Sequence, residues 1–253
     1  MSYQALRVTA ELMAPVILDR RQPLDGILAA TRIEDPELRR RDREFRRFKR
    51  NVERFGYENA VAWWKQHGWE VPEDCHFLPL AVFGHGHEHG LWVYCSSFAI
   101  LDEYERGLTH FHKRLDWELA GQWVEPSHKR IQTGKGEFKN QRVPLMYQAV
   151  NTVTWYVKGN YNEIVETLNQ TYELFKKRNR GYGQVRSWQV EQIEHDRSVF
   201  SEDGEIMRPV PARLLESMGI EGNFVYEYTT YRPPYWQPRY ATRCAVGGKI
   251  NEK

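Results

Sequence analysis

Residues 176–188, KKRNRGYGQVRSW, connect a predicted helix to a predicted strand and decide the fold class of this chain. Before them, apolar residues at helical spacing predict a helix from Asn160 to Phe175, with Glu163 at the spacing of a capping box. After them, alternating residues predict a strand over Val185–Ile193. A helix, a basic glycine-punctuated turn and a strand therefore follow one another directly.

On both sides of this segment, apolar residues at helical spacing and alternating apolar residues predict the other helices and strands of one folded unit. The order is strand, helix, two strands, a basic insertion, strand, helix, glycine loop and strand, which is an α+β, ferredoxin-like (RRM-like) arrangement. The predicted strands are Tyr3–Met13, His76–Phe83, Leu91–Ile100 and Leu145–Val157, and the first helix is PLDGILAATRI, residues 23–33. Asp25 is expected to cap or orient the turn into that helix, because it precedes Gly26.

Three segments extend this unit. A helix predicted over Asp35–Phe55 carries an apolar seam and a basic stripe of Arg43, Arg47, Arg50 and Arg54, and a short helix follows before Pro72. Residues 102–144 are polar, basic and poorly periodic, which indicates a functional or mobile insertion. A short helix, a strand over Phe224–Tyr231 and the proline-rich YRPPYWQPRY are expected to end the ordered chain.

Charge is segregated along the 253 residues, although the net charge is only +2. Four stretches, 39–54, 128–142, 175–190 and 228–251, carry net charges of +6, +4, +5 and +4. The rest of the chain is therefore strongly acidic. Chance clustering of solvated charges is the alternative, but the four stretches together favour a surface that binds a polyanion.

Composition also indicates where in the cell the protein is expected. No apolar run is long enough to span a bilayer, the start of the chain lacks the layout of a signal peptide, and the three cysteines have no paired spacing. We expect a cytoplasmic protein with reduced thiols and no membrane partner.

The glycine turn is the strongest candidate site. Glycines at Gly181 and Gly183 allow backbone amides to approach a phosphate, and the neighbouring Lys and Arg side chains supply charge. Tyr182 and Trp188 offer rings for base stacking. The alternative, a C-capped turn without a ligand, is equally compatible with these residues alone.

Three motifs in order carry a resemblance: PLDGILAA (23–30), RNRGYGQVRSW (178–188) and MRPVPARL (207–214). Together they resemble the RAMP superfamily of CRISPR ribonucleoproteins, and in particular the Cas5-type subunit of type IV effectors. The resemblance implies a single RAMP-type domain over 1–253, with a helical insertion at 34–72, a basic thumb-like insertion at 102–144 and a C-terminal extension at 204–253.

The resemblance implies a subunit that caps the 5′ handle of the guide RNA (crRNA). Its partners would be crRNA, the backbone and large subunits of the effector, and target DNA through the complex. Residues 127–142 are the candidate for the thumb that leans over the RNA, with a disordered surface loop as the alternative. The predicted RNA-binding residues are Lys135, Lys139, Lys177, Arg178, Arg180, Gly181, Tyr182, Gly183, Arg186, Trp188 and Arg208.

Catalysis is not expected. The chain has no GxSxG, P-loop or HExxH motif, and no cofactor or metal is predicted. Histidines at 85, 87 and 89, and at 110 and 112, leave a metal-free endoribonuclease that processes CRISPR precursor RNA as the alternative, and a zinc site as a weaker one. A third alternative is a protein-interaction module whose basic faces meet acidic subunits.

Overall fold

The computed structural model describes residues 3–18, 22–32, 54–68, 78–84, 91–114, 133–135, 139–235 and 238–251, together with Arg47, Arg50, Asn51 and Asp116. The predicted helix over 35–55 lies largely outside these residues, as do the histidine-rich turn at 85–90 and most of residues 115–138.

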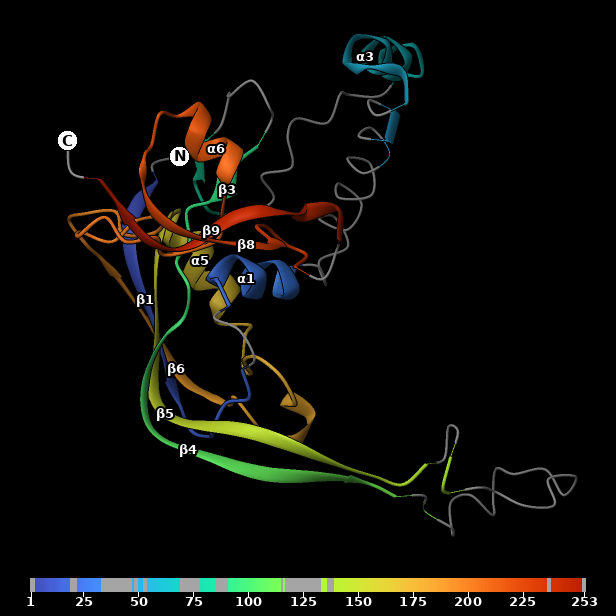
Figure 1. Ribbon diagram of the computed structural model, residues 1–253, viewed down its shortest axis with the longest axis vertical. Coiled ribbons are helices and arrows are strands. Elements are labelled where there is room, and N and C mark those ends of the chain that lie inside the picture. The colour runs from blue at the N-terminus through green and yellow to red at the C-terminus, as the bar shows by residue number, and fades with distance from the viewer. Residues whose placement is uncertain are drawn as a thin grey trace, which may run out of the picture.

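A four-stranded antiparallel sheet forms the centre of the molecule (Figure 1). Its strands are β1 (Gln4–Leu12), β4 (Ile100–Lys113), β5 (Gln141–Gly159) and β6 (Val185–Gln192), in the order β4-β5-β1-β6. The register places Val8 opposite both Trp155 and Val190. The protein is therefore α+β with mainly antiparallel sheets, as the sequence predicted.

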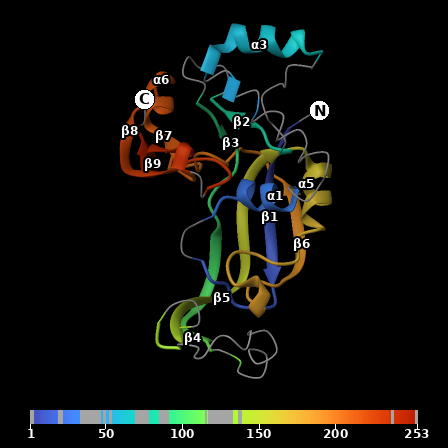
Figure 2. The ribbon, with the colours of Figure 1, turned by 90° about the vertical axis from the view of Figure 1, so that its right-hand side faces the viewer.

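Two helices cover one face of this sheet (Figure 2). They are α1 (Leu24–Arg32) and α5 (Tyr161–Leu168). Alternate residues of β1 are buried beneath them, because successive strand residues point to opposite faces. The shared core contains Leu6, Val8, Leu28, Trp155 and Ile164, each no more than 1% exposed.

The helix that precedes the glycine turn is shorter than predicted. It begins at the expected capping box, where the Glu163 amide donates to Asn160 Oδ1 over 3.3 Å, but it ends at Leu168 and not at Phe175. The prediction was wrong there because the apolar residues beyond Leu168 pack in an irregular segment. Phe175 adopts a positive φ of 63°, and Glu173 forms a β-bridge with Gln184.

Both ends of the predicted insertion at 102–144, residues 102–113 and 141–144, are regular structure, which corrects the sequence-based prediction there. Residues up to Lys113 form β4, and β5 begins at Gln141, so the two strands form a hairpin that extends beyond the rest of the sheet (Figure 1). Most side chains of β4 are exposed, including Tyr104 and Leu108. A strand without a buried face has no need of apolar alternation, and the sequence therefore lacked the signal.

The C-terminal residues form a second sheet with its own apolar cluster. Its elements are β7 (Val210–Pro211), α6 (Ala212–Ser217), β8 (Gly222–Thr230), η2 (Pro238–Tyr240) and β9 (Ala241–Ile250), and its strand order is β7-β9-β8. The sequence predicted that the ordered chain ends at the proline-rich stretch, and that prediction was wrong, because β9 follows it. That stretch turns the chain back, so β9 pairs antiparallel with β8 and buries Cys244 and Ala245.

The remaining elements are short. The predicted strands at 76–83 and 91–100 reduce to β2 (Val82–Phe83) and β3 (Val93–Tyr94), with single bridges from Leu80 and Ser96 to β5. Helix α3 (Tyr57–Gln66) has its own small cluster around Trp64. Among the described helices, none has the length and apolarity needed to cross a membrane.

Candidate nucleic-acid interface

The glycine turn folds across the end of β1. It contains a short 3₁₀ helix, η1 (Arg178–Arg180), preceded by Lys177 and followed by Gly181, both with positive φ. Two backbone hydrogen bonds hold it to the segment after β1, since Lys176 N donates to Ile17 O and Gly183 N donates to Pro15 O over 2.8 Å. The basic side chains of the turn are therefore presented from a fixed backbone.

The two glycine amides are not available as a phosphate cradle, contrary to the sequence-based expectation. Gly183 N donates a hydrogen bond to Pro15 O, and Gly181 N donates one to Arg178 O over 2.9 Å. Gly183 is needed for packing instead: its φ is 71°, and a Cβ there would lie 2.1 Å from Leu174 O. Anion binding at this turn must come from side chains.

Those side chains gather around one ring of the β4–β5 hairpin. Arg180 Cζ lies 4.3 Å and Lys177 Nζ lies 5.3 Å from the centroid of the Phe111 ring, within cation–π range. Arg178 lies between them on η1, and all three cations are exposed. We call Phe111, Lys177, Arg178 and Arg180 the Phe111 cluster.

The Phe111 cluster carries unneutralised positive charge. Within the described part of the chain, no carboxylate pairs with Lys177, Arg178 or Arg180. Sequence reasoning missed Phe111, because only the strand pairing brings β4 to the glycine turn. The local signal in the sequence is the His110-Phe111-His112 triplet, in which a phenylalanine lies between two histidines.

The opposite face of the hairpin holds the histidines. Paired residues of antiparallel strands share a face, so His112 and Arg142 lie together, as do His110 and Pro144. Arg142 Nη2 lies 3.4 Å from His110 Nδ1. Lys135 and Lys139, two of the predicted RNA-binding residues, are exposed in the connection between the strands. This end of the hairpin is therefore basic on both sides.

Two other predicted residues lie on β6 and point in different directions. Arg186 is exposed, and its Nη1 pairs with Glu11 over 2.8 Å beside a polar recess that includes Thr9 and Gln189. Trp188 faces the core instead of solvent. Its ring centroid lies 6.0 Å from that of Trp155, and its Nε1 donates to Thr171 O over 2.9 Å. Trp188 is thus a packing residue, which corrects its assignment as a base-stacking ring.

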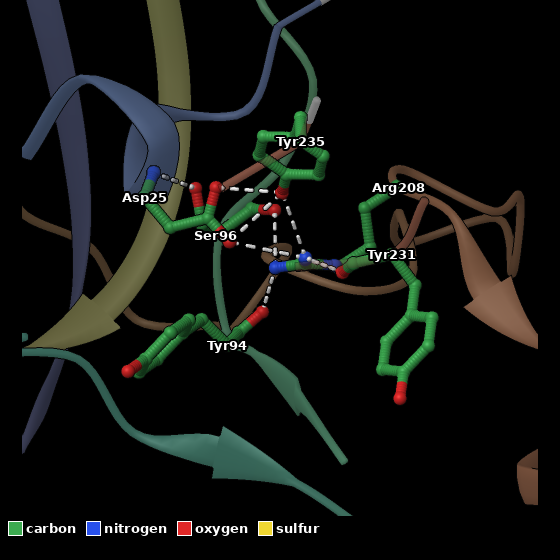
Figure 3. A network of polar contacts seen from close by, with 6 residues as sticks. All are labelled: Asp25, Tyr94, Ser96, Arg208, Tyr231 and Tyr235. Atoms are coloured by element: carbon green, nitrogen blue, oxygen red, sulfur yellow. Dashed lines mark hydrogen bonds and ion pairs between the residues drawn. The ribbon is translucent and has the colours of Figure 1, made fainter. Parts of the chain in front are cut away.

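Arg208 was predicted to bind RNA, but its side chain is fully buried (Figure 3). Its Nη2 pairs with Asp25 Oδ2 over 3.1 Å and donates to Tyr231 O and to the hydroxyl of Tyr235. Its Nη1 donates to the Tyr94 carbonyl. Because the side chain is fully buried and both Nη atoms donate to protein groups, Arg208 stabilises the fold and is not accessible to RNA.

Asp25 is the centre of the same network. It accepts hydrogen bonds from the Tyr235 hydroxyl at 2.8 and 3.0 Å, and its backbone amide donates to Ser96 Oγ. Burial raises the pKa of Asp25, while the nearby charge of Arg208 and the hydrogen bond from Tyr235 oppose that rise. Burial likewise places the pKa of Tyr235 well above its ordinary value. The network joins α1 to the segment that carries the C-terminal sheet.

The fold and the Phe111 cluster describe an α+β protein with a basic, aromatic-backed face next to an extended hairpin. The chain belongs to the family of the CRISPR type IV associated protein Csf3, whose model matches residues 4–246. It is thus a type IV CRISPR-associated protein. A search of curated proteins found no match to the chain.

Proposed function

We propose that the protein is a non-catalytic crRNA-binding subunit of a type IV CRISPR effector ribonucleoprotein, which caps the 5′ handle of the guide and docks against the backbone subunit. Family membership supports a place among the other Cas subunits of such an effector. RNA binding rests on the residues of this chain, and chiefly on the Phe111 cluster.

The strand order supports a ferredoxin-like, RAMP-type core. In the order β4-β5-β1-β6, β1 and β6, which come first and last along the chain, are neighbours in the sheet. Helices α1 and α5 lie on one face of it. That is the connectivity of two interleaved βαβ units, in which each crossover helix returns to the same side. In this interpretation β4, and neither β2 nor β3, is the second strand of the unit.

The Phe111 cluster carries the proposal because its cations are exposed and have no carboxylate partner among the described residues, and because Arg180 and Lys177 are held against the Phe111 ring. Guanidinium and ammonium groups bind phosphate oxygens through charge-assisted hydrogen bonds. Stacking on Phe111 restricts Arg180 and Lys177 without neutralising them. Less side-chain entropy is then lost when a phosphate binds, which favours a defined backbone path over loose ionic attraction.

The β4–β5 hairpin is the element that we assign as the thumb. It extends beyond the sheet and presents Tyr104, Leu108 and Met146, which are 66%, 54% and 58% exposed. Exposed apolar side chains on a basic hairpin suit contact with both a neighbouring subunit and RNA. The thumb predicted from sequence, residues 127–142, falls in the chain between the end of β4 and the start of β5 and lies mostly outside the described residues.

Salt-dependent binding of a handle RNA tests the RNA-binding role. Each lost phosphate contact makes the slope of log K against log salt shallower by about 0.7 for a single strand. We expect that decrease for Arg180→Gln, and about twice as much for the double variant with Lys177→Gln. Arg213→Gln removes an exposed arginine from α6 and is the matched control. Unchanged slopes for both glycine-turn variants would refute the site.

The absence of catalysis needs its own assay. Purified protein is incubated with labelled repeat RNA without metal, over a range of pH. We expect no specific product. A specific cut that disappears in a His110→Ala or His112→Ala variant would establish the endoribonuclease alternative in place of the non-catalytic role.

A further inference from the structure

A second aromatic and basic surface lies on the C-terminal sheet. Tyr226 and Tyr228 on β8 are 38% and 78% exposed, and Arg243 on β9 is exposed as well. The two tyrosines are two residues apart on one strand, and Tyr228 is the pairing partner of Arg243. All three side chains therefore share one face of the sheet.

The inner part of this surface is held in place by its neighbours. Arg243 Cζ lies 4.2 Å from the centroid of the Tyr226 ring, and the Phe224 ring contacts Tyr226 edge-on, with centroids 6.3 Å apart. Tyr226 is thus confined between a cation and an apolar ring. Tyr228 beside it keeps most of its surface in solvent, so an aromatic face is ready for a planar ligand.

The charge of this surface indicates which kind of ligand it can bind. Arg243 supplies a positive charge to this face, beside Tyr226. Glu227 lies between the two tyrosines in sequence, but it pairs with Cys244 and so belongs to the other face. In the part of the chain that the structure covers, Arg243 has no carboxylate partner. A planar, anionic ligand fits a ring that lies beside an unpaired guanidinium.

We propose that Tyr226, Tyr228 and Arg243 form a stacking surface for unpaired nucleotides of a single-stranded nucleic acid. A base would stack on Tyr228, and Arg243, positioned by Tyr226, would bind the adjoining phosphate. A tyrosine on a β-strand can stack on any of the bases, because every base has a π-face. The large exposed apolar side chains described on this face are Tyr226 and Tyr228, and two rings beside a guanidinium suit base stacking and phosphate binding.

This surface is separate from the Phe111 cluster. β8 and β9 belong to the C-terminal sheet, whereas Phe111 belongs to β4, and the hairpin of β4 and β5 extends away from β8 and β9 in Figure 1. The proposal therefore does not depend on binding of the handle at the glycine turn. The surface would be a second binding point, either for the nucleic acid that leaves the Phe111 cluster or for a different nucleic-acid molecule.

Oligonucleotide binding by the full-length protein tests this proposal. Fluorescence anisotropy with labelled twelve-nucleotide oligouridine and oligothymidine measures affinity for RNA and DNA. Loss of one stacked base corresponds to roughly 5- to 150-fold weaker binding. We expect a decrease in this range for Tyr228→Leu, with an unchanged salt slope, and nearly full affinity for Tyr228→Phe. Tyr161→Leu, which removes an exposed tyrosine from α5, should bind like the wild type.

The salt slope separates the two sites. A defect at the Phe111 cluster changes the slope, whereas loss of stacking changes affinity alone, so either proposal can fail without the other. As an independent measurement, wild-type protein is photocrosslinked to oligouridine that contains 5-iodouridine. A crosslinked peptide that contains Tyr226 or Tyr228 supports the surface.

Two results would overturn the proposal. One is wild-type affinity in Tyr228→Leu together with crosslinks confined to other peptides. The other is a Tyr228→Leu variant that binds oligonucleotides normally but fails to join a partner subunit, which would assign the surface to protein. Thermal midpoints equal to the wild type confirm that the variants are folded. If Tyr228→Leu does not fold, the wild-type crosslink map decides alone.

Discussion

Removal of Arg208 is expected to destabilise the protein severely and to leave its RNA contacts unchanged. The side chains of Arg208 and Asp25 are both fully buried, and the guanidinium also donates to the carbonyls of Tyr94 and Tyr231. Arg208→Met would leave the Asp25 carboxylate in the core with only the Tyr235 hydroxyl and backbone nearby. A buried charge without its partner has few ways to recover solvation.

The expected loss follows from that burial. Breaking a buried ion pair by removing one partner costs about 3–5 kcal/mol. Domains are typically stable by about 5–15 kcal/mol, so the variant would lose a substantial share of its free energy of unfolding. For a chain of this size, about 2–4 °C is lost per kcal/mol, which gives a midpoint lower by roughly 6–20 °C. The exposed pair Arg7–Glu191 is the matched comparison, and Arg7→Ala should cost less than about 1 kcal/mol.

Urea denaturation monitored by tryptophan fluorescence and circular dichroism measures these differences in the free energy of unfolding. A double variant, Asp25→Asn with Arg208→Met, leaves no buried charge. It should therefore be less destabilised than the sum of the two single variants, with a coupling of about 1–3 kcal/mol. The reasoning is refuted if Arg208→Met is as stable as Arg7→Ala. It is also refuted if a folded Arg208 variant has a shallower salt slope for RNA.

Two further predictions follow from the backbone and from the thiols. Gly183→Ala should lower the free energy of unfolding by at least twice as much as Gly181→Ala, because both positions have positive φ but only the Gly183 Cβ would meet a backbone carbonyl. Equal costs in denaturant titrations would contradict that account. Burial raises the pKa of Cys95 to about 11 and that of Cys244 to about 12. In a Cys75→Ser background, neither thiol should react with a disulfide reagent at pH 8 until the protein is unfolded, since about one Cys95 in a thousand is then a thiolate. Both thiol pKa values are higher in the folded state than in the unfolded state. The contribution of the two neutral thiols to the free energy of unfolding is therefore complete below the unfolded pKa near 9 and decreases as pH rises towards 11. Rapid labelling of the folded protein would show that the thiols are accessible.

Sequence periodicity predicted the elements that have one buried face. β1, α1 and β6 were found within one residue of their predicted bounds, because a half-buried strand or helix must repeat its apolar residues with its own period. β5 was also predicted, but it begins at Gln141, four residues before its predicted start. The capping box at Asn160 was also predictable, since both partners lie in one turn. The same reasoning missed β4, whose two faces are both largely exposed, and extended α5 over apolar residues that pack without helical geometry.

The candidate site divides in the same way. The sequence alone determined that a basic, glycine-punctuated turn precedes the last strand of the central sheet, because glycine, lysine and arginine act locally through their conformations and charges. Only the tertiary structure decided what those cations meet. Strand pairing brings Phe111 beneath Arg180 and Lys177, and burial turns Trp188 into the core. Arg208 shows the reason most clearly: its partner Asp25 is 183 residues away, and whether an arginine faces solvent or a buried carboxylate is set by the packing between them.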